Sequence, residues 1–168
     1  MNGLLLSEVS NFKYLGHYLT NELNDDLDIK RQCRSLYIHG NTIIRKFHMC
    51  SIDVKLQLFK TFCAPLYTAH LWWNFSKNAM DKMRKAYHNV LKNIVGLSKY
   101  ESTSGLCAYL NVKSFGAVRR NLIYGFMCRI KKSDNLILKA ILNSNIYFKS
   151  PIRKHWIECL YLYHEFID

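Results

Sequence analysis

Proline and glycine are scarce in this sequence, with two prolines and seven glycines among 168 residues. Linkers and low-complexity tracts are usually rich in these residues, so the chain contains no obvious linker, and it contains no internal repeat either. Long apolar runs are also missing, since none approaches the roughly 18 residues of a membrane-spanning helix. The start of the chain lacks the basic region that opens a secretory signal peptide. These absences predict an intracellular protein with no membrane span.

Paired cysteines are the next absence. The six cysteines stand far apart, and none belongs to a CxxC or CxxxxC pair. A zinc ribbon or zinc knuckle is therefore not expected. Without a secretory signal a disulfide framework is not expected either, and thiols on apolar helix faces act as small hydrophobic residues.

Catalytic motifs are missing as well. The sequence has no GxxxxGK[ST], GxGxxG or GxSxG run and no HExxH pair. Its densest acids are Asp25, Asp26 and Asp28, which stand where a helix is expected to begin. Acids at that position are usually caps that complement the helix dipole. The pattern therefore predicts no catalytic site, no metal and no cofactor.

Acidic residues are few overall, and this shortage makes the chain strongly basic. Twenty-four Lys and Arg stand against twelve Asp and Glu, which gives a net charge of +12. Residues 30 to 100 carry thirteen basic residues, and their only acids are Asp53 and Asp81. A surface of this kind attracts polyanions, namely RNA, DNA or an anionic membrane.

The residues that are present predict a mainly α fold, a helical bundle with a short N-terminal β-hairpin. Phe12, Tyr14 and the run 18–20 flank Gly16, which suits two short strands joined by a turn. Helical periodicity follows over 25–47, from Ser51 towards Pro65, over 76–96, in a short helix from Ser104, and over 114–132, 134–143 and 151–166.

Three of these segments predict how the bundle is arranged. The helix over 25–47 is amphipathic, with Arg31, Arg34 and Arg45 opposite its apolar side. The segment after Ser51 is apolar nearly all round, so we expect it at the centre of the domain. The helix over 76–96 has an apolar stripe, and we expect its lysines to project on the other side; they are Lys82, Lys85 and Lys92.

An ordered series of motifs then goes beyond composition. It consists of FKYLG at 12–16, the RKFHMCS junction at 45–51, LYTAHLWW at 66–73 and AYHNVL at 86–91. This series resembles the region that follows the catalytic palm in reverse transcriptases of LINE-type, non-LTR retrotransposons. The resemblance covers about residues 9–132, and residues 133–168 form a C-terminal helical extension of unassigned role.

The resemblance implies specific roles. Phe12 to Gly16 would be the primer-grip hairpin, and the helices after it would be the thumb, which holds a template–primer duplex across its phosphates. The candidate nucleic-acid-binding residues, combining this resemblance with the helical pattern, are Lys13, Tyr14, Leu15, Gly16, Lys30, Arg31, Arg34, Arg45, Lys46, Lys82 and Lys85. A nuclear location is also what the family implies.

The sequence departs from that family in one respect that matters. The Tyr-x-Asp-Asp turn that carries the metal-binding aspartates of the polymerase is absent. We therefore expect a truncated, non-catalytic fragment that binds RNA, DNA or their hybrid. The same features are compatible with a functionless transposon remnant.

Two other kinds of partner stay open. A protein-interaction module could use Leu4-Leu5-Leu6 and the edge of the hairpin to bind a palm domain or a new protein. A peripheral membrane protein could use its basic faces with Trp72 and Trp73, although these rings follow an apolar helix and are expected in the core. The oligomeric state is not predicted.

Overall fold

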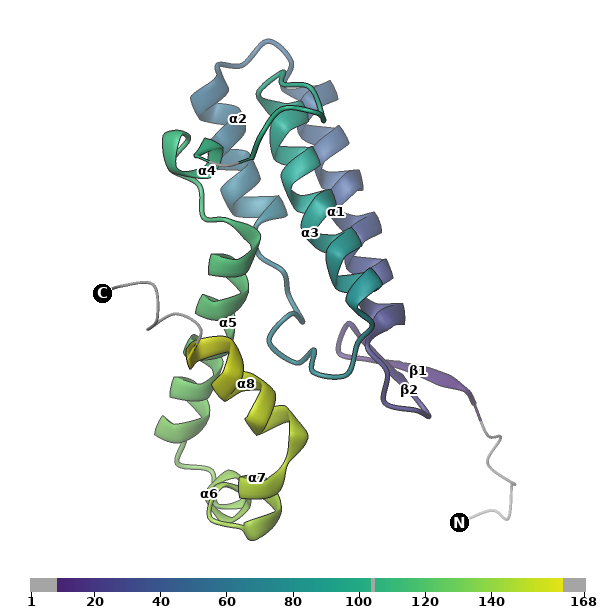
Figure 1. Ribbon diagram of the computed structural model, residues 1–168, viewed down its shortest axis with the longest axis vertical. Helices are drawn as coiled ribbons and strands as arrows, with labels where there is room; N and C mark the ends of the chain where they lie inside the picture. Colours follow the sequence, from purple (N-terminus) through teal and green to yellow (C-terminus); the bar gives the residue numbers. More distant parts are fainter. Residues whose placement is uncertain (1–8, 104, 162–168) are drawn as a thin grey trace.

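A computed structural model describes residues 9–103 and 105–161 of the chain, and these residues form the predicted mainly α fold with an N-terminal hairpin (Figure 1). The hairpin consists of β1 (Asn11–Tyr14) and β2 (His17–Thr20). It is followed by α1 (Asp26–Lys46), α2 (Ile52–Leu58), a π-helical turn η1 (Phe59–Cys63), α3 (Lys77–Ile94), α4 (Leu106–Tyr109), α5 (Phe115–Lys132), α6 (Leu136–Leu142), α7 (Asn145–Lys149) and α8 (Pro151–Tyr161).

The hairpin is antiparallel, with Phe12 opposite Leu19 and Tyr14 opposite His17. Leu15 and Gly16 form the two-residue turn between the strands, and both have a positive φ, 45° and 81°. Positive φ at both positions is the geometry of the tight turns that match the twist of a hairpin. The glycine at position 16 is therefore required by the turn.

Helices α1 and α3 lie side by side and run in the same direction (Figure 1). Residues fifty positions apart meet along their whole length. At the first turns, the Ser76 amide donates to the Asp26 carboxylate over 2.8 Å. Further along, the sulfur atoms of Cys33 and Met83 are 3.2 Å apart. Gly40 lies against Val90, and it has no side chain that would hold the helices apart.

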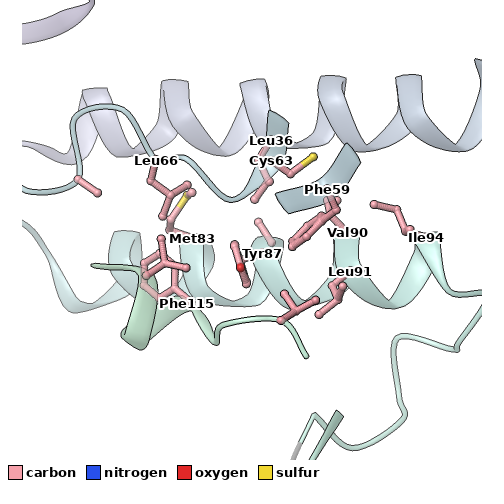
Figure 2. Close-up of a cluster of buried hydrophobic side chains, with 14 of the residues drawn as sticks. Leu36, Phe59, Cys63, Leu66, Met83, Tyr87, Val90, Leu91, Ile94 and Phe115 are labelled. Carbon is pink, nitrogen blue, oxygen red and sulfur yellow. The ribbon is translucent and has the colours of Figure 1, made fainter. Parts of the chain in front are cut away.

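The core lies between this helix pair and the η1 turn (Figure 2). Phe59 and Tyr87 meet edge to face with 5.2 Å between ring centroids, and Phe115 of α5 closes the other side of Tyr87. Only one side of the segment 52–67 is buried, which corrects the expectation of a helix buried all round. Its outward residues are Val54, Phe62 and Tyr67.

The departure has a local cause. At Phe59 the helix widens to a π-turn, in which the Ala64 amide donates to the Phe59 carbonyl over 2.9 Å, directly before Pro65. The π-turn places Phe59 and Cys63 on the core side and turns Phe62 outward. A π-turn of this kind inserts one residue into the helical repeat, so the apolar residues no longer follow a period of 3.6.

The C-terminal helices follow α5 towards the end of the molecule that lies opposite α2 (Figure 1). The indole of Trp156 in α8 donates to the His70 carbonyl over 2.8 Å and meets the ring of Phe126 in α5. Helix α7 was not expected, and α6 is shorter than the expected 134–143. Ser104 and the run 162–166 lie outside the described residues. In the described part, no helix is long and apolar enough to cross a membrane.

Candidate nucleic-acid interface

Helix α1 carries a row of exposed cations on the side away from the core. Lys30, Arg34 and Arg45 are exposed, whereas Ile29 and Ile43 beside them in sequence are buried. Positions four, then eleven residues apart return to the same side of an α-helix. The row from Lys30 to Arg45 is about 22 Å long, at 1.5 Å per residue.

Helix α3 adds a second row next to the first. Lys82 and Lys85 are exposed and lie on the same side of Met83, the residue that meets Cys33 of α1. Burial raises the pKa of the Cys33 thiol, and the ammonium group of Lys82 acts in the opposite direction, so Lys82 borders the seam between the helices. We call the five residues Lys30, Arg34, Arg45, Lys82 and Lys85 the α1–α3 basic face.

Two acids of the same helices, Asp26 and Asp81, stand one helical turn from Lys30 and Lys85. Asp26 accepts a hydrogen bond from the Ser76 amide, and Asp81 forms an ion pair with Arg84 at 3.1 Å. Tyr37 and Asn41 stand two helical turns after Lys30 and Arg34, so they lie on the same side of α1 as these cations. Between Arg34 and Arg45 this side of α1 therefore carries neutral residues and no acid.

Three other cations singled out from the sequence, Lys46, Arg31 and Lys92, lie outside this face. Lys46 is exposed at the end of α1 and borders, with Arg45, a shallow hollow of about 530 Å³. Arg31 is turned inward: its Nε donates to Asp28 over 2.8 Å, and 28% of its side chain is exposed. Lys92 was expected to project outward, but it is buried, and its ammonium donates to the carbonyls of Lys99 and Glu101.

The burial of Asp28 was not predicted from the sequence. The residue has no exposed surface, and its carboxylate accepts hydrogen bonds from Thr68 Oγ1 at 2.5 Å and Trp72 Nε1 at 2.8 Å. His17 Nδ1 of the hairpin lies 3.1 Å away. Burial by itself would raise the pKa of Asp28, but the donors His17, Thr68, Arg31 and Trp72 outweigh it and hold that pKa far below its usual range.

Asp25 forms a second contact between the same segments. Its carboxylate accepts from the amides of Trp73 and Asn74, both over 2.9 Å, and burial raises its pKa. Asp25 makes no capping bond; instead the Asn24 side chain accepts from the Asp26 amide over 2.8 Å. The cap-and-dipole interpretation was therefore incomplete, because Asp25 and Asp28 bind residues of the segment 64–76 that lie forty to forty-nine positions away.

The hairpin residues Lys13, Tyr14 and Leu15 are exposed, and Gly16 is half-buried against Tyr67. The Lys13 ammonium lies 5.9 Å from the ring centroid of Tyr18 across the hairpin. The hairpin lies at the flank of the molecule, beside the first turns of α1 and α3 (Figure 1), and His17 holds it against Asp28. The turn of the hairpin packs against Tyr67 and borders a hollow with Ser35 and His39, which lie on another side of α1 than Lys30 and Arg34.

The described residues do not form a metal site or a reactive thiol. No three His, Cys, Asp or Glu residues in the described ranges are placed to hold a metal ion. Burial raises the pKa of the Cys63 thiol to about 12, a value that leaves it inert as a nucleophile. Trp72 is fully buried, which confirms the expected core position and removes it as a membrane anchor; Leu4-Leu5-Leu6 lies outside the described residues.

Comparison of the chain with protein-family models, with curated proteins and with solved structures finds no match.

Proposed function

We propose that this chain binds nucleic acid, without catalysing a reaction on it, through the α1–α3 basic face and the tip of the adjoining hairpin. The observation that carries the proposal is the parallel pairing of α1 and α3, which sets five exposed cations from two helices on one side of the molecule. The resemblance of residues 9–132 to the thumb region of LINE-type reverse transcriptases supports the same role and a transposon origin.

The physical basis is neutralisation of phosphates. Each lysine or arginine that contacts a phosphate releases counterions, so affinity falls as salt rises. The row on α1 extends for about 22 Å, which is roughly two thirds of one turn of duplex. A duplex is therefore long enough to cover the whole row, and Lys13 and Tyr14 are exposed on the neighbouring hairpin.

The test is fluorescence anisotropy of a labelled RNA–DNA hybrid titrated with the protein at several salt concentrations. Contacts to four or five phosphates predict a log–log salt slope near −4, at about 0.9 per phosphate. Single-stranded RNA and duplex DNA of the same length rank the preferred form. Absence of binding at low salt by the folded chain would refute the proposal.

Matched variants locate the interface. Arg34→Ala and Lys82→Ala each remove one cation from the α1–α3 basic face, so each is expected to weaken binding and to reduce the slope by about 0.9. Lys132→Ala removes an exposed cation at the end of α5 and serves as the control. Equal effects of all three substitutions would mean that net charge alone, and no defined face, determines binding.

A further inference from the structure

Helices α6 and α7 bury none of their residues, although their sequences, LILKAIL and NIYFK, are mostly apolar. Leu136, Ile137 and Ile146 are 81%, 71% and 83% exposed, and Ile141 and Phe148 are exposed beside them. We call these five residues, which lie on more than one side of the two neighbouring helices, the α6–α7 apolar surface. A soluble domain normally turns the apolar side of a helix towards its core, so this many exposed apolar side chains on two adjacent helices indicate a site of interaction.

The surface belongs to well-formed helices. The Asn135 side chain caps α6 by accepting from the Ile137 amide over 2.9 Å, and Ser144 caps α7 by accepting from the Tyr147 amide over 3.2 Å. Contacts with α5 and α8 hold both helices in place. The pair lies at the end of the molecule opposite α2 and the last turns of α1 and α3 (Figure 1). It is thus separate from the α1–α3 basic face.

The surroundings of this surface are basic. Residues 129–154 include seven Lys and Arg and one acid, Asp134, which pairs with Lys139 at 3.0 Å. At the edge of the surface, the guanidinium of Arg153 lies 5.1 Å from the ring centroid of Phe148. A partner that covers these apolar side chains therefore meets cations around them.

We propose that the α6–α7 apolar surface docks an acidic, amphipathic segment of another protein. Apolar side chains of that segment cover the exposed leucine and isoleucines, and its carboxylates pair with the surrounding lysines and arginines. A second copy of this chain lacks the required acidic residues, because its own α6–α7 apolar surface is bordered by lysines and arginines that would repel those of the first copy. The proposal is independent of nucleic-acid binding, since it concerns different residues at a different end of the molecule.

The probe is a labelled synthetic peptide of about 18 residues, or about five helical turns, with leucine on one face and glutamate on the other. A second peptide has lysine in place of every glutamate. The glutamate peptide is expected to bind saturably and about ten-fold or more tightly than the lysine peptide. Failure of the glutamate peptide to bind, or equal affinity for both peptides, would overturn the proposal.

Paired substitutions assign the binding to this surface. Ile137→Glu and Ile146→Glu each place a carboxylate on this surface, and each is expected to lower the affinity for the glutamate peptide about ten-fold. Ile38→Glu is the matched control, because Ile38 is 63% exposed on α1 and lies away from α6 and α7. Since all three side chains are exposed, the variants should keep the wild-type circular dichroism spectrum and melting temperature.

Two outcomes separate this proposal from its rivals. Ile137→Glu should leave the affinity for RNA–DNA hybrid unchanged, whereas Ile38→Glu should weaken it, because Ile38 stands among the cations of α1. Vesicles of phosphatidylcholine with phosphatidylserine serve as the lipid probe. Binding to these vesicles as tight as to the peptide, and lost in Ile137→Glu, would identify a lipid-binding surface and overturn the protein partner.

Discussion

Asp28 is a charged group that the fold encloses completely and surrounds with hydrogen-bond donors. Its donors come from three separate segments: His17 from the hairpin, Arg31 from α1, and Thr68 and Trp72 from the segment that leads to α3. A buried charge is tolerated only when it is paired and hydrogen-bonded, and removing one partner is costly. This carboxylate therefore holds the hairpin against α1, together with Asp25, which lies 3.7 Å from the other ring nitrogen of His17.

Replacement of this carboxylate by an amide tests that dependence. Asp28→Asn keeps the shape of the side chain but removes its charge and turns an NH₂ group towards the surrounding donors. We expect the free energy of unfolding in urea to fall by about 3 kcal/mol, the scale for breaking a buried charged pair. Asp134→Asn is the control, because that aspartate is fully exposed in a surface pair, and it should change stability by less than about 0.5 kcal/mol.

At the residue scale the sequence predicted surface positions better than buried polar ones. Lys30, Arg34 and Lys82 are exposed as expected, because helical periodicity separates them from the apolar stripe. Asp28 and Lys92 have the same periodicity as surface residues, yet both are buried. Their partners lie elsewhere in the chain, at Thr68, Trp72 and the carbonyls of Lys99 and Glu101, and local patterns contain no information about such contacts.

At the scale of elements, the parallel pair α1–α3 depends on a close approach at Gly40. A Cβ added there would stand 2.4 Å from a methyl carbon of Val90, a contact that the packed side chain cannot relieve. We expect Gly40→Ala to destabilise the protein by about 1–3 kcal/mol, the usual cost of overpacking a core. Urea unfolding measures this change.

A second glycine provides the matched control. Gly125 also lies within a helix, and an added Cβ there would meet only the Arg129 side chain, at an ordinary 3.6 Å. Alanine is the better helix former by up to about 1 kcal/mol, so Gly125→Ala should leave stability unchanged or raise it. Destabilisation of the same size in both variants would contradict the close approach of α1 and α3.

The docking of α8 should depend on pH through His155. The imidazole lies against the guanidinium of Arg119 and the thiol of Cys159, with the ring of Phe75 and the carboxylate of Glu158 nearby. Burial, and then the charge of Arg119, lower the pKa of His155, while Glu158 acts in the opposite direction. Because the folded state binds this proton less readily than the unfolded chain, stability is lost as pH falls below the unfolded value of about 6.5.

This sign gives a direct measurement. Urea unfolding at pH 7.5 and pH 5.5 should show lower stability at pH 5.5, and His155→Gln should remove part of that difference. Two further half-buried imidazoles, His70 and His88, contribute in the same direction, since partial burial also lowers their pKa. His48→Gln is the control, because this histidine is exposed at the end of α1. An unaltered pH dependence in His155→Gln would contradict the assignment.

Element boundaries were predictable where the chain carries local signals for them. Ser51, Ser76 and Ser114 cap α2, α3 and α5 as expected, and Gly96 follows the end of α3 with a φ of 77°. The π-turn and α7 were not predicted, because a one-residue insertion shifts the apolar period and a helix of five residues is too short to establish one.

At the scale of the whole molecule, the candidate interface arises from a pairing that no local pattern specifies. Periodicity predicted a basic side for α1 and another for α3, but only their parallel packing, with residues fifty positions apart in contact, brings the two together. The same arrangement leaves α6 and α7 at the opposite end of the long axis (Figure 1). The molecule thus has two surfaces of different chemistry, one cationic and one apolar with a cationic border.

Separation of the two surfaces predicts that their ligands bind independently. Two binding sites are coupled only when both ligands favour the same one of two protein conformations. The helix that connects these sites, α5, is seen in a single conformation. The affinity for RNA–DNA hybrid, measured by anisotropy, should therefore change by less than about two-fold when the glutamate peptide is saturating. This limit applies after correction for the ionic strength that the charged peptide adds to the solution. A scrambled peptide of the same charge controls for that effect. Stronger competition by the amphipathic peptide than by the scrambled one would contradict independent binding, because the two peptides carry equal charge and differ in their ability to occupy the α6–α7 apolar surface.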